Sequence, residues 1–302
     1  MSMRKYCKPA ISIKAQIDKL EKRGLKFKDA TEAEEILSNI SYYRLRAYTY
    51  PFQDNKNPGH PFTQEITFEE IIKLYEFDSK LRLIIFEATE YIEVALRTQI
   101  VYQMSIKNGS HWHSEPKFYR DSYRFAKHLT TLQEEIDRSK EDFISHYRKN
   151  YNDPQSPPAW MSLEVVSMGL LSKMFKNLIF GEEKKAILSH FGLKKIDILE
   201  NWMLCFATLR NICAHHSRVW NRRLIQINIP KDTIDEFLNN VNSQPNKLYI
   251  TLSCMVYMLK RINPKCNFVE SIKELVSSFD GPSKILKDMG FPPDWEQEKL
   301  WN

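Results

Sequence analysis

Residues 67–107 read TFEEIIKLYEFDSKLRLIIFEATEYIEVALRTQIVYQMSIK. Apolar side chains recur in this stretch every three or four positions, which is the period of one face of an α-helix. Thr67 and Glu70 have the spacing of a capping box, and Asn108-Gly109 follows as a stop signal. The stretch therefore predicts one long amphipathic helix, whose buried face carries Leu74, Phe77, Leu81, Ile84, Ile85, Ala88, Ile92 and Leu96.

Helical periodicity also governs the chain on either side of this stretch. Ser12 is expected to cap a short helix that ends at Gly24, and Thr31-x-x-Glu34 has the spacing of a capping box for the next helix. Only residues 224–229 alternate with the period of a strand. The sequence therefore predicts an all-α fold, with further helices at 121–151, 160–178, 182–191, 196–215, 232–241, 248–262 and 268–279.

The composition is that of an ordinary globular protein. Of the 302 residues, 42% are hydrophobic and 27% are charged, so the chain can bury a core without the help of a disulfide or a metal. The eight glycines argue against a glycine-rich phosphate-binding loop. We treat residues 1–302 as a single helical domain, with a candidate subdomain break at the proline-rich loop 152–158.

The cysteines and the apolar segments indicate the compartment. Five cysteines without a CxxC pair are typical of a reducing environment. The first residues lack the apolar core of a signal peptide, and the longest uncharged run, between Lys247 and Lys260, is too short to span a bilayer. We therefore expect a soluble, cytoplasmic protein outside the membrane. The net charge of +6 is compatible with a polyanionic partner but does not require one.

The predicted helix 196–215 separates an apolar face from a polar one. On a helical wheel, a stripe of apolar side chains faces the core. Arg210, Asn211 and His215 lie together on a different face at the end of the helix, and His216 lies near the edge of the stripe. The apolar stripe consists of Leu199, Trp202, Phe206, Leu209 and Cys213.

An arginine, an amide and a histidine on one face can cleave RNA without a metal. Such cleavage needs a base for the ribose 2′-OH, an acid for the leaving 5′-oxygen and a cation for the phosphorane oxygens. Histidine titrates in the range for acid or base duty, and arginine binds phosphate oxygens with a forked guanidinium. The spacing by itself also arises by chance, and a polar face ending in a histidine at a helix C-terminus is the structural alternative.

The run Arg210-Asn211-Ile212-Cys213-Ala214-His215-His216 resembles the Arg-x(4–6)-His motif of HEPN-superfamily ribonucleases. The wider chain resembles the Abi-like abortive-infection family of bacteria, the AbiD/AbiF group. This likeness rests on residues 40–45 with 48–52, on 74–82 with 92–97, on the motif, and on Met289-Gly290-Phe291-Pro292-Pro293-Asp294-Trp295. These stretches span most of the chain in the order that the family has.

The resemblance implies a HEPN-like helical bundle with additional N- and C-terminal helices, with the motif inside 196–223. It assigns catalytic roles to Arg210 and His215, with Asn211 in support and His216 as an alternative to His215. It also implies ribonuclease activity in phage defence or in toxin-like growth arrest. The chain has no second motif, and HEPN ribonucleases commonly build the site from two facing motifs, so the resemblance implies a homodimer.

Other basic and aromatic residues are candidates for binding RNA. Three arginines follow the motif, and an aromatic-basic segment lies near residue 44, although a packed aromatic segment with arginines at its rim is the favoured interpretation there. The expected RNA-binding residues are Arg218, Arg222, Arg223, Tyr43, Arg44 and Arg46. Glu93 and Arg97 are first of all an i,i+4 ion pair on a helix surface, and a supporting role at the site is the second interpretation.

The resulting hypothesis is a metal-independent endoribonuclease without a cofactor. Attack by the 2′-OH would leave a 2′,3′-cyclic phosphate and a 5′-OH, and its partners would be substrate RNA and a regulatory noncoding RNA. The alternative is a non-catalytic RNA-binding or partner-binding helical module. Elsewhere, His111 and His113 are expected to be solvated loop histidines, and Trp295 and Trp301 to anchor the C-terminal tail in the core.

Overall fold

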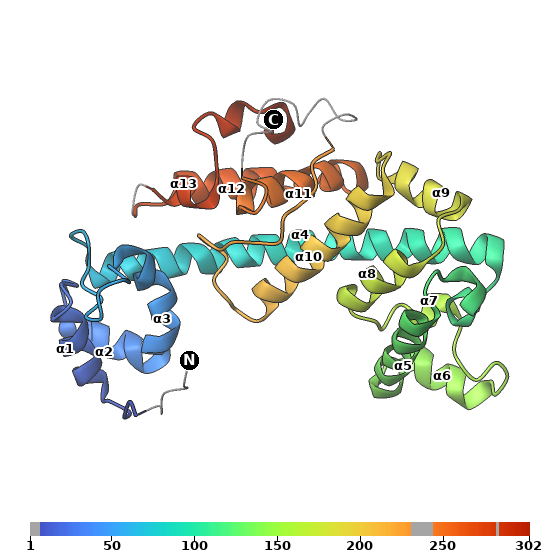
Figure 1. The fold of residues 1–302 in the computed structure, drawn as a ribbon, viewed down its shortest axis with the longest axis horizontal. Coiled ribbons are helices and arrows are strands. Elements are labelled where there is room, and N and C mark those ends of the chain that lie inside the picture. Colours follow the sequence, from blue (N-terminus) through green and yellow to red (C-terminus); the bar gives the residue numbers. More distant parts are fainter. Residues whose placement is uncertain (1–6, 231–243, 282–283) are drawn as a thin grey trace. The chain divides into compact units, whose positions relative to one another are not determined.

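The computed structural model describes residues 7–230, 244–281 and 284–302, and their regular structure is helical (Figure 1). Within these ranges the β-type pairing is limited to isolated bridges, such as Lys26 with Thr67, and no strand forms. The predicted all-α class is therefore confirmed. The helix predicted at 232–241 lies outside the described residues. No described helix combines the length and the apolar character that crossing a membrane requires.

The chain divides into two compact units. The first contains Met1–Leu81 and Leu275–Ser283, and the second contains Arg82–Glu274 and Lys284–Asn302. The proline-rich loop 152–158 lies inside the second unit, where a subdomain boundary stays a prediction.

The first unit contains α1 (Ile13–Glu21), α2 (Ala30–Asn39), α3 (Tyr42–Thr49), the 3₁₀ turn η1 (Tyr50–Phe52) and the start of α4 (Phe68–Asn108). The hydroxyl of Ser12 accepts from the Ala15 amide, so its predicted cap is confirmed. The capping box predicted at Thr31 and Glu34 is wrong. Asp29, two residues earlier, caps α2 instead, because its carboxylate accepts from the Thr31 and Glu32 amides.

Helix α4 forms as predicted. The Thr67 amide donates to the Glu70 carboxylate at 2.8 Å, and the Glu70 amide donates to the Thr67 hydroxyl at 3.2 Å, which is the reciprocal pattern of a capping box. The helix ends at Asn108, and Gly109 follows with a φ of +84°, where a glycine avoids the cost of a Cβ. The predicted buried face holds, with Ile84 the one member that is half-buried.

The second unit contains the remainder of α4, most of α12 and the other helices. These are α5 (Ser122–Arg138), α6 (Asp142–Asn150), α7 (Ala159–Ser162), α8 (Met168–Asn177), α9 (Glu182–His190), α10 (Ile196–Ala214), α11 (Leu248–Ile262), α12 (Phe268–Ser277) and α13 (Ile285–Met289). Its 3₁₀ turns are η2 (Trp112–Ser114), η3 (Pro116–Phe118), η5 (Trp295–Gln297) and η6 (Lys299–Trp301).

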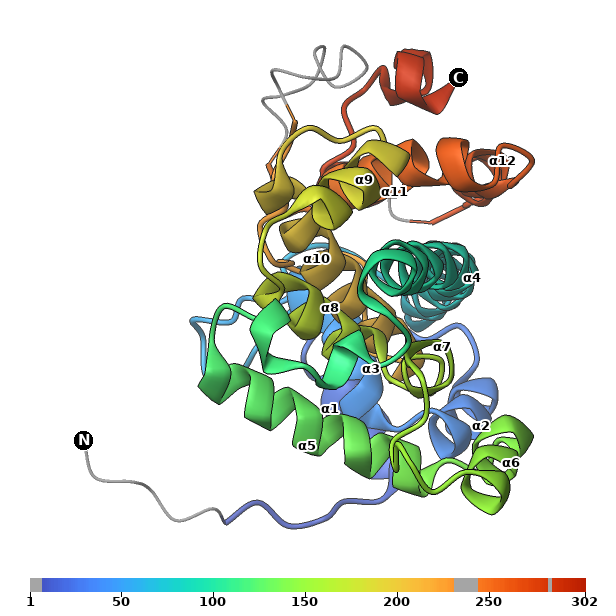
Figure 2. The ribbon, with the colours of Figure 1, turned by 90° about the vertical axis from the view of Figure 1, so that its right-hand side faces the viewer.

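Packing in the second unit centres on α8, α10 and α11. Helix α10 contacts α8, α9 and α11, and α5 contacts α8. Figure 2 looks along α4 and shows α8 and α10 to one side of it. Every residue from Leu248 to Leu259 on α11 is buried, and Trp202 of α10 meets Tyr257 edge to face at 5.7 Å between ring centroids. Because an all-round apolar helix is stable only when it is covered on every side, α11 forms the centre of this core.

Two helices predicted as continuous are each divided. The stretch 121–151 breaks after Arg138, and α6 starts again at Asp142. The stretch 160–178 breaks between α7 and α8, because the carbonyls of Leu163, Glu164 and Val166 accept from a buried arginine instead of from the next helical turn. Ser167 then caps α8.

The strand predicted at 224–229 is wrong. The Leu224 and Ile227 amides donate to the carbonyls of Asn246 and Pro245, but no ladder follows. Side chains of α10 bind the backbone of Asn228: Trp202 donates its indole N–H to the Asn228 carbonyl at 2.7 Å, and Asn201 accepts from the Asn228 amide at 2.7 Å. The segment is therefore extended against a helix.

The tryptophans near the C-terminus anchor it as predicted. Trp295 and Trp301 are buried, and the Trp301 indole donates to the Ser253 hydroxyl on α11 at 3.0 Å. The prediction of solvated histidines in the loop after α4 is wrong for His113, which is 1% exposed. The short turn η2 carries Trp112 and His113 inward together, whereas His111 binds Ser110 and the Ser156 carbonyl.

Candidate functional site

The motif lies where α10 ends. His215 is the C-cap residue, and His216 follows with a left-handed φ of +53°. The His216 amide donates to the Cys213 carbonyl at 2.9 Å, and the Ser217 amide donates to the Ile212 carbonyl at 3.0 Å. This pair of bonds is a Schellman motif, in which a residue other than glycine occupies the left-handed position. The two histidines therefore occupy different backbone environments at the helix end.

The polar face predicted from the wheel is present. The Arg210 guanidinium donates from Nη1 to Oδ1 of Asn211 at 3.3 Å. Asn211 and His215 are exposed, and the Arg210 side chain is 35% exposed, while all five residues of the apolar stripe are buried. A guanidinium and an amide are thus presented together to solvent within one turn of the histidine.

Glu93 and Arg97 form a buried ion pair on α4. Arg97 Nη2 lies 2.6 Å from Glu93 Oε1, and their side chains are 8% and 13% exposed. Arg97 Nη1 also donates to the backbone carbonyls of Glu164 (2.8 Å) and Val166 (3.0 Å) and to that of Leu163. The interpretation of this pair as a surface ion pair is therefore wrong, because the turn between α7 and α8 covers it.

The Glu93 carboxylate also reaches Arg210. Its Oε2 lies 3.8 Å from Arg210 Nε, so one carboxylate serves two guanidinium groups, and the Arg210 guanidinium lies 5.6 Å from the Phe86 ring centroid. A carboxylate in this position favours a fixed place for the arginine side chain. The structure thus brings together three of the residues singled out in the sequence, Glu93, Arg97 and Arg210.

A groove opens beside Arg210. Its volume is about 830 Å³, and it adjoins a smaller hollow of about 240 Å³; both are lined by Glu93, Arg97, Glu164 and Arg210. The larger groove is also lined by residues 138–141, where α5 passes into α6, and by residues 164–167, before α8. The motif therefore borders a recess as well as open surface.

The three arginines that follow the motif differ in their contacts and in their exposure to solvent. Arg218 donates to the Asn221 carbonyl at 3.4 Å and lies 5.7 Å from the Trp220 ring centroid. Arg222 donates to the Arg218 carbonyl at 3.3 Å, and both it and Arg223 are exposed. The structure therefore leaves Arg222 and Arg223 accessible just beyond α10.

The aromatic-basic segment forms α3, in the first unit. Its Leu45 and Tyr48 are buried, and Tyr48 donates to the Asp78 carboxylate at 2.6 Å. Tyr43 is 80% exposed, Arg44 is exposed, and Arg46 is half-buried. One face of α3 thus packs into the first unit, as the favoured interpretation expects, and the other face carries the three candidate RNA-binding residues.

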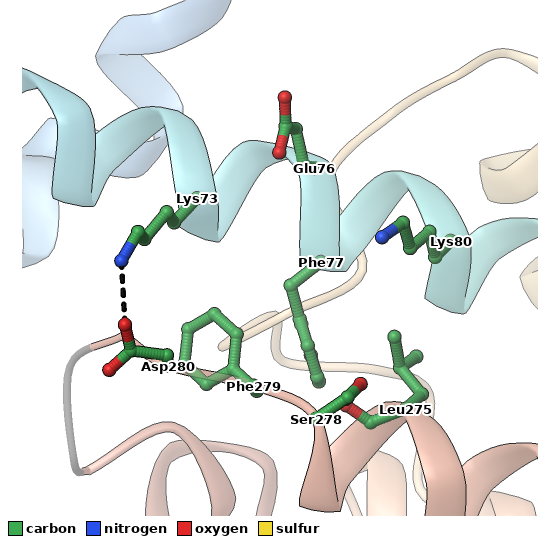
Figure 3. Close-up of a pocket in the computed structure, with 8 residues that line it drawn as sticks. All are labelled: Lys73, Glu76, Phe77, Lys80, Leu275, Ser278, Phe279 and Asp280. Atoms are coloured by element: carbon green, nitrogen blue, oxygen red, sulfur yellow. Dashed lines mark hydrogen bonds and ion pairs between the residues drawn. The ribbon is translucent and has the colours of Figure 1, made fainter.

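A separate hollow of about 170 Å³ belongs to the first unit (Figure 3). Phe77 of α4 and Phe279 meet at 4.7 Å between ring centroids, and Lys73 pairs with Asp280 at 2.8 Å. Figure 3 shows Glu76 pointing away from these groups. Because the ion pair is exposed and the hollow is small, we assign no role to it.

The walls of the groove are residues that the sequence did not indicate. Glu135 accepts from the amide of Ser167 at 2.8 Å and from its hydroxyl at 3.3 Å, which ties the end of α5 to the start of α8. Arg138 and Lys140 follow on the same side. These residues lie in segments with ordinary surface composition, so only their spatial neighbours distinguish them.

A family model described as Abi-like protein matches residues 35–221, more than half of the chain. The matched residues include α4 and the motif, and they end before Arg222 and Arg223. No curated protein and no solved structure matches the chain.

Proposed function

The chain belongs to the Abi-like family, and on this premise we propose that it is a metal-independent endoribonuclease of the HEPN type. It acts in abortive infection, as phage defence, or as a toxin-like growth inhibitor. The family match supports the defence role, and the chemistry of the α10 terminus supports the cleavage.

One observation carries the proposal. Arg210 and Asn211 are presented together at the exposed end of α10, next to His215, while the buried Glu93 carboxylate lies 3.8 Å from Arg210. A partly exposed guanidinium beside a recess is suited to the phosphorane oxygens, because hydrogen-bond donors fixed in advance stabilise charge as it develops. Asn211 is suited to orienting the scissile phosphate or the imidazole.

The reaction needs an acid and a base. The base removes the proton of the ribose 2′-OH, the 2′-oxygen bonds to phosphorus, and the bond from phosphorus to O5′ breaks as the acid supplies a proton. The products are a 2′,3′-cyclic phosphate and a 5′-OH. His215 is the histidine that we assign to this chemistry, and a second copy of the chain supplies the other motif of a homodimeric site.

Cleavage of a mixed RNA pool in EDTA tests this function. We expect wild-type protein to cut the RNA and leave cyclic-phosphate ends, and Arg210→Ala/His215→Ala to be inactive. Arg222→Ala/Arg223→Ala is the matched control, because it removes exposed arginines next to the motif and should weaken RNA binding without abolishing the chemical step. Cleavage by the double variant would reject the motif as the active site. Wild-type RNA binding without cleavage would reject the ribonuclease and leave a non-catalytic RNA-binding module.

A further inference from the structure

The groove beside Arg210 is lined by residues from several segments of the second unit. Glu93 and Arg97 of α4 line it together with Arg210 of α10. Residues 138–141 and residues 164–167 also line it, and the hydrogen bonds from Ser167 to Glu135 hold these two segments together. The groove therefore joins residues from different helices and includes Arg210 of the motif.

Most of the charged groups in the groove already form ion pairs or hydrogen bonds within the protein. Glu93 pairs with Arg97 and Arg210, and Glu135 accepts twice from Ser167. Arg138 and Lys140 are different, because both are exposed and neither forms an ion pair with any residue in the described part of the chain. The only side-chain hydrogen bond that Arg138 makes there runs from Nε to the Glu134 carbonyl of its own helix, at 3.3 Å. These two side chains are available cations in a groove whose other two cations, Arg97 and Arg210, share the Glu93 carboxylate.

We propose that this groove binds single-stranded RNA, with Arg138 and Lys140 as its phosphate contacts. The proposal rests on the proposed function, since the strand that it binds is the substrate cut at Arg210 and His215. A strand whose scissile phosphate meets Arg210 continues along the groove, where Arg138 and Lys140 each receive one further phosphate. Arginine and lysine are the side chains that proteins most use for this contact.

The carboxylates of the groove favour an unpaired strand over a duplex. Glu141 and Glu164 are exposed along the same recess. A carboxylate repels a phosphate but accepts hydrogen bonds from the amino groups of bases. An unpaired strand can turn its phosphates to Arg138 and Lys140 and its base edges to the carboxylates. In a duplex the base edges are paired, and the deep major groove hides them from side chains.

Charge reversal with a charge-matched control tests the groove. All variants carry His215→Ala so that RNA is not consumed, and the probe is a single-stranded RNA oligonucleotide of mixed sequence. The test variant is Arg138→Glu/Lys140→Glu. The control is Lys127→Glu/Lys149→Glu, because these exposed lysines lie on α5 and α6 away from the groove and change the net charge equally.

We expect the groove variant to lose at least tenfold in affinity and the control to lose far less. The slope of log affinity against log salt should fall by about 1.4 in the groove variant, from about 0.7 for each lost phosphate contact on a single strand. Equal losses in both variants would mean that only net charge matters and would overturn the proposal, as would no loss in either. Equal affinity for duplex RNA of the same length would overturn the preference for a single strand.

The failure of this proposal can be told apart from the failure of the proposed function. Wild-type cleavage together with equal binding by the groove variant and the control would reject the groove alone. Binding that depends on the groove, without cleavage by the wild type, would reject the ribonuclease and leave the groove as an RNA-binding site. Circular dichroism of each variant shows whether it is folded before its affinity is compared.

Discussion

The Glu93 carboxylate contacts two guanidinium groups, those of Arg97 and Arg210. Its contact with Arg97 is short and buried, and Arg97 is itself fixed by three backbone carbonyls. Its contact with Arg210 is longer and partly exposed. The first contact therefore anchors the carboxylate, and the second leaves Arg210 free to approach a phosphate. In the proposed reaction Glu93 is a positioning residue that acts through Arg210.

Replacing Glu93 by glutamine keeps the shape of the side chain and removes its charge. We expect Glu93→Gln to lower the free energy of unfolding by about 2 kcal/mol, since a hydrogen bond to a charged group contributes about 1.5–3 kcal/mol. We also expect kcat to fall at least tenfold, with a smaller change in RNA affinity. Urea unfolding and cleavage kinetics measure both. Glu87→Gln, an exposed carboxylate on the same helix that does not line the groove or the smaller hollow, is the control. An unchanged kcat in Glu93→Gln would reject the positioning role.

His113 is expected to make the free energy of unfolding depend on pH. Burial, with a smaller effect of neighbouring His111, lowers the pKa of His113 from 6.5 to about 4. The unfolded chain therefore binds the proton first as the pH falls, so the contribution of neutral His113 is complete above about pH 6.5 and is lost between pH 6.5 and 4. The shift corresponds to a loss of about 3 kcal/mol of folding free energy.

The variant His113→Leu should remove most of this pH dependence. Neither ring nitrogen of His113 has a hydrogen-bond partner among the residues that the structure describes, so leucine forfeits none of the described bonds and fills a similar space. We expect the free energy of unfolding to depend less steeply on pH from 6.5 to 4, as measured by urea unfolding across that range. His146→Gln, which changes an exposed histidine, should keep the wild-type slope. An unaltered slope in His113→Leu would assign the acid sensitivity to other groups.

At the scale of elements, the end of α10 gives His215 and His216 different backbone conformations. His215 ends the helix, whereas the backbone of His216 is left-handed and donates to the Cys213 carbonyl. A left-handed residue other than glycine costs about 1–2 kcal/mol. The chain thus adopts an unfavourable backbone conformation at His216, and α10 ends immediately after the proposed catalytic residues.

Glycine at position 216 separates the two histidines as candidates. We expect His216→Gly to keep the RNA cleavage rate, because His215 is the assigned residue, and to keep or raise the thermal midpoint, because glycine adopts the left-handed conformation at no steric cost. Cleavage assays and thermal unfolding measure these effects, beside His215→Gly, which should be inactive. Loss of cleavage in His216→Gly with activity in His215→Gly would reverse the assignment.

At the scale of the whole molecule, each chain contains one copy of the motif. The family match extends across the boundary between the units, since residues 35–81 belong to the first and 82–221 to the second. The match therefore includes part of each unit. An acid and a base from facing motifs require two copies of the whole chain, and this is the basis of the proposed homodimer.

A homodimeric active site predicts the mass of two chains in solution and a cleavage rate per chain that depends on protein concentration. Sedimentation of the purified protein should give about twice the 35.9 kDa of one chain. On dilution below the dissociation constant of the dimer, the cleavage rate per chain should fall, because each separated chain carries only half of the proposed active site. A protein that sediments as one chain and cleaves RNA at an undiminished rate per chain would show that the site is complete in a single copy.

Periodicity and composition are enough to predict the helical class and most helices. The apolar repeat of residues 67–107 determines α4, since only a helix of that length puts these residues on one face. The α10 motif is also visible in the chain, because Arg210, Asn211 and His215 are close along one helix. Local capping was harder to predict, as Asp29 shows, because several residues near a helix start can accept the same amide protons.

The environment of the motif was decided by the tertiary structure. Arg97 divides α7 from α8 by taking backbone carbonyls from a segment 66 residues away, and it buries a pair that the i,i+4 spacing places on a surface. The groove walls at Arg138 and Glu164 meet through Glu135 and Ser167, which are 32 residues apart. The sequence by itself determined the helices and the motif, because these depend on neighbours along one helix. Only packing decided the buried carboxylate and the groove, because both join residues from different helices.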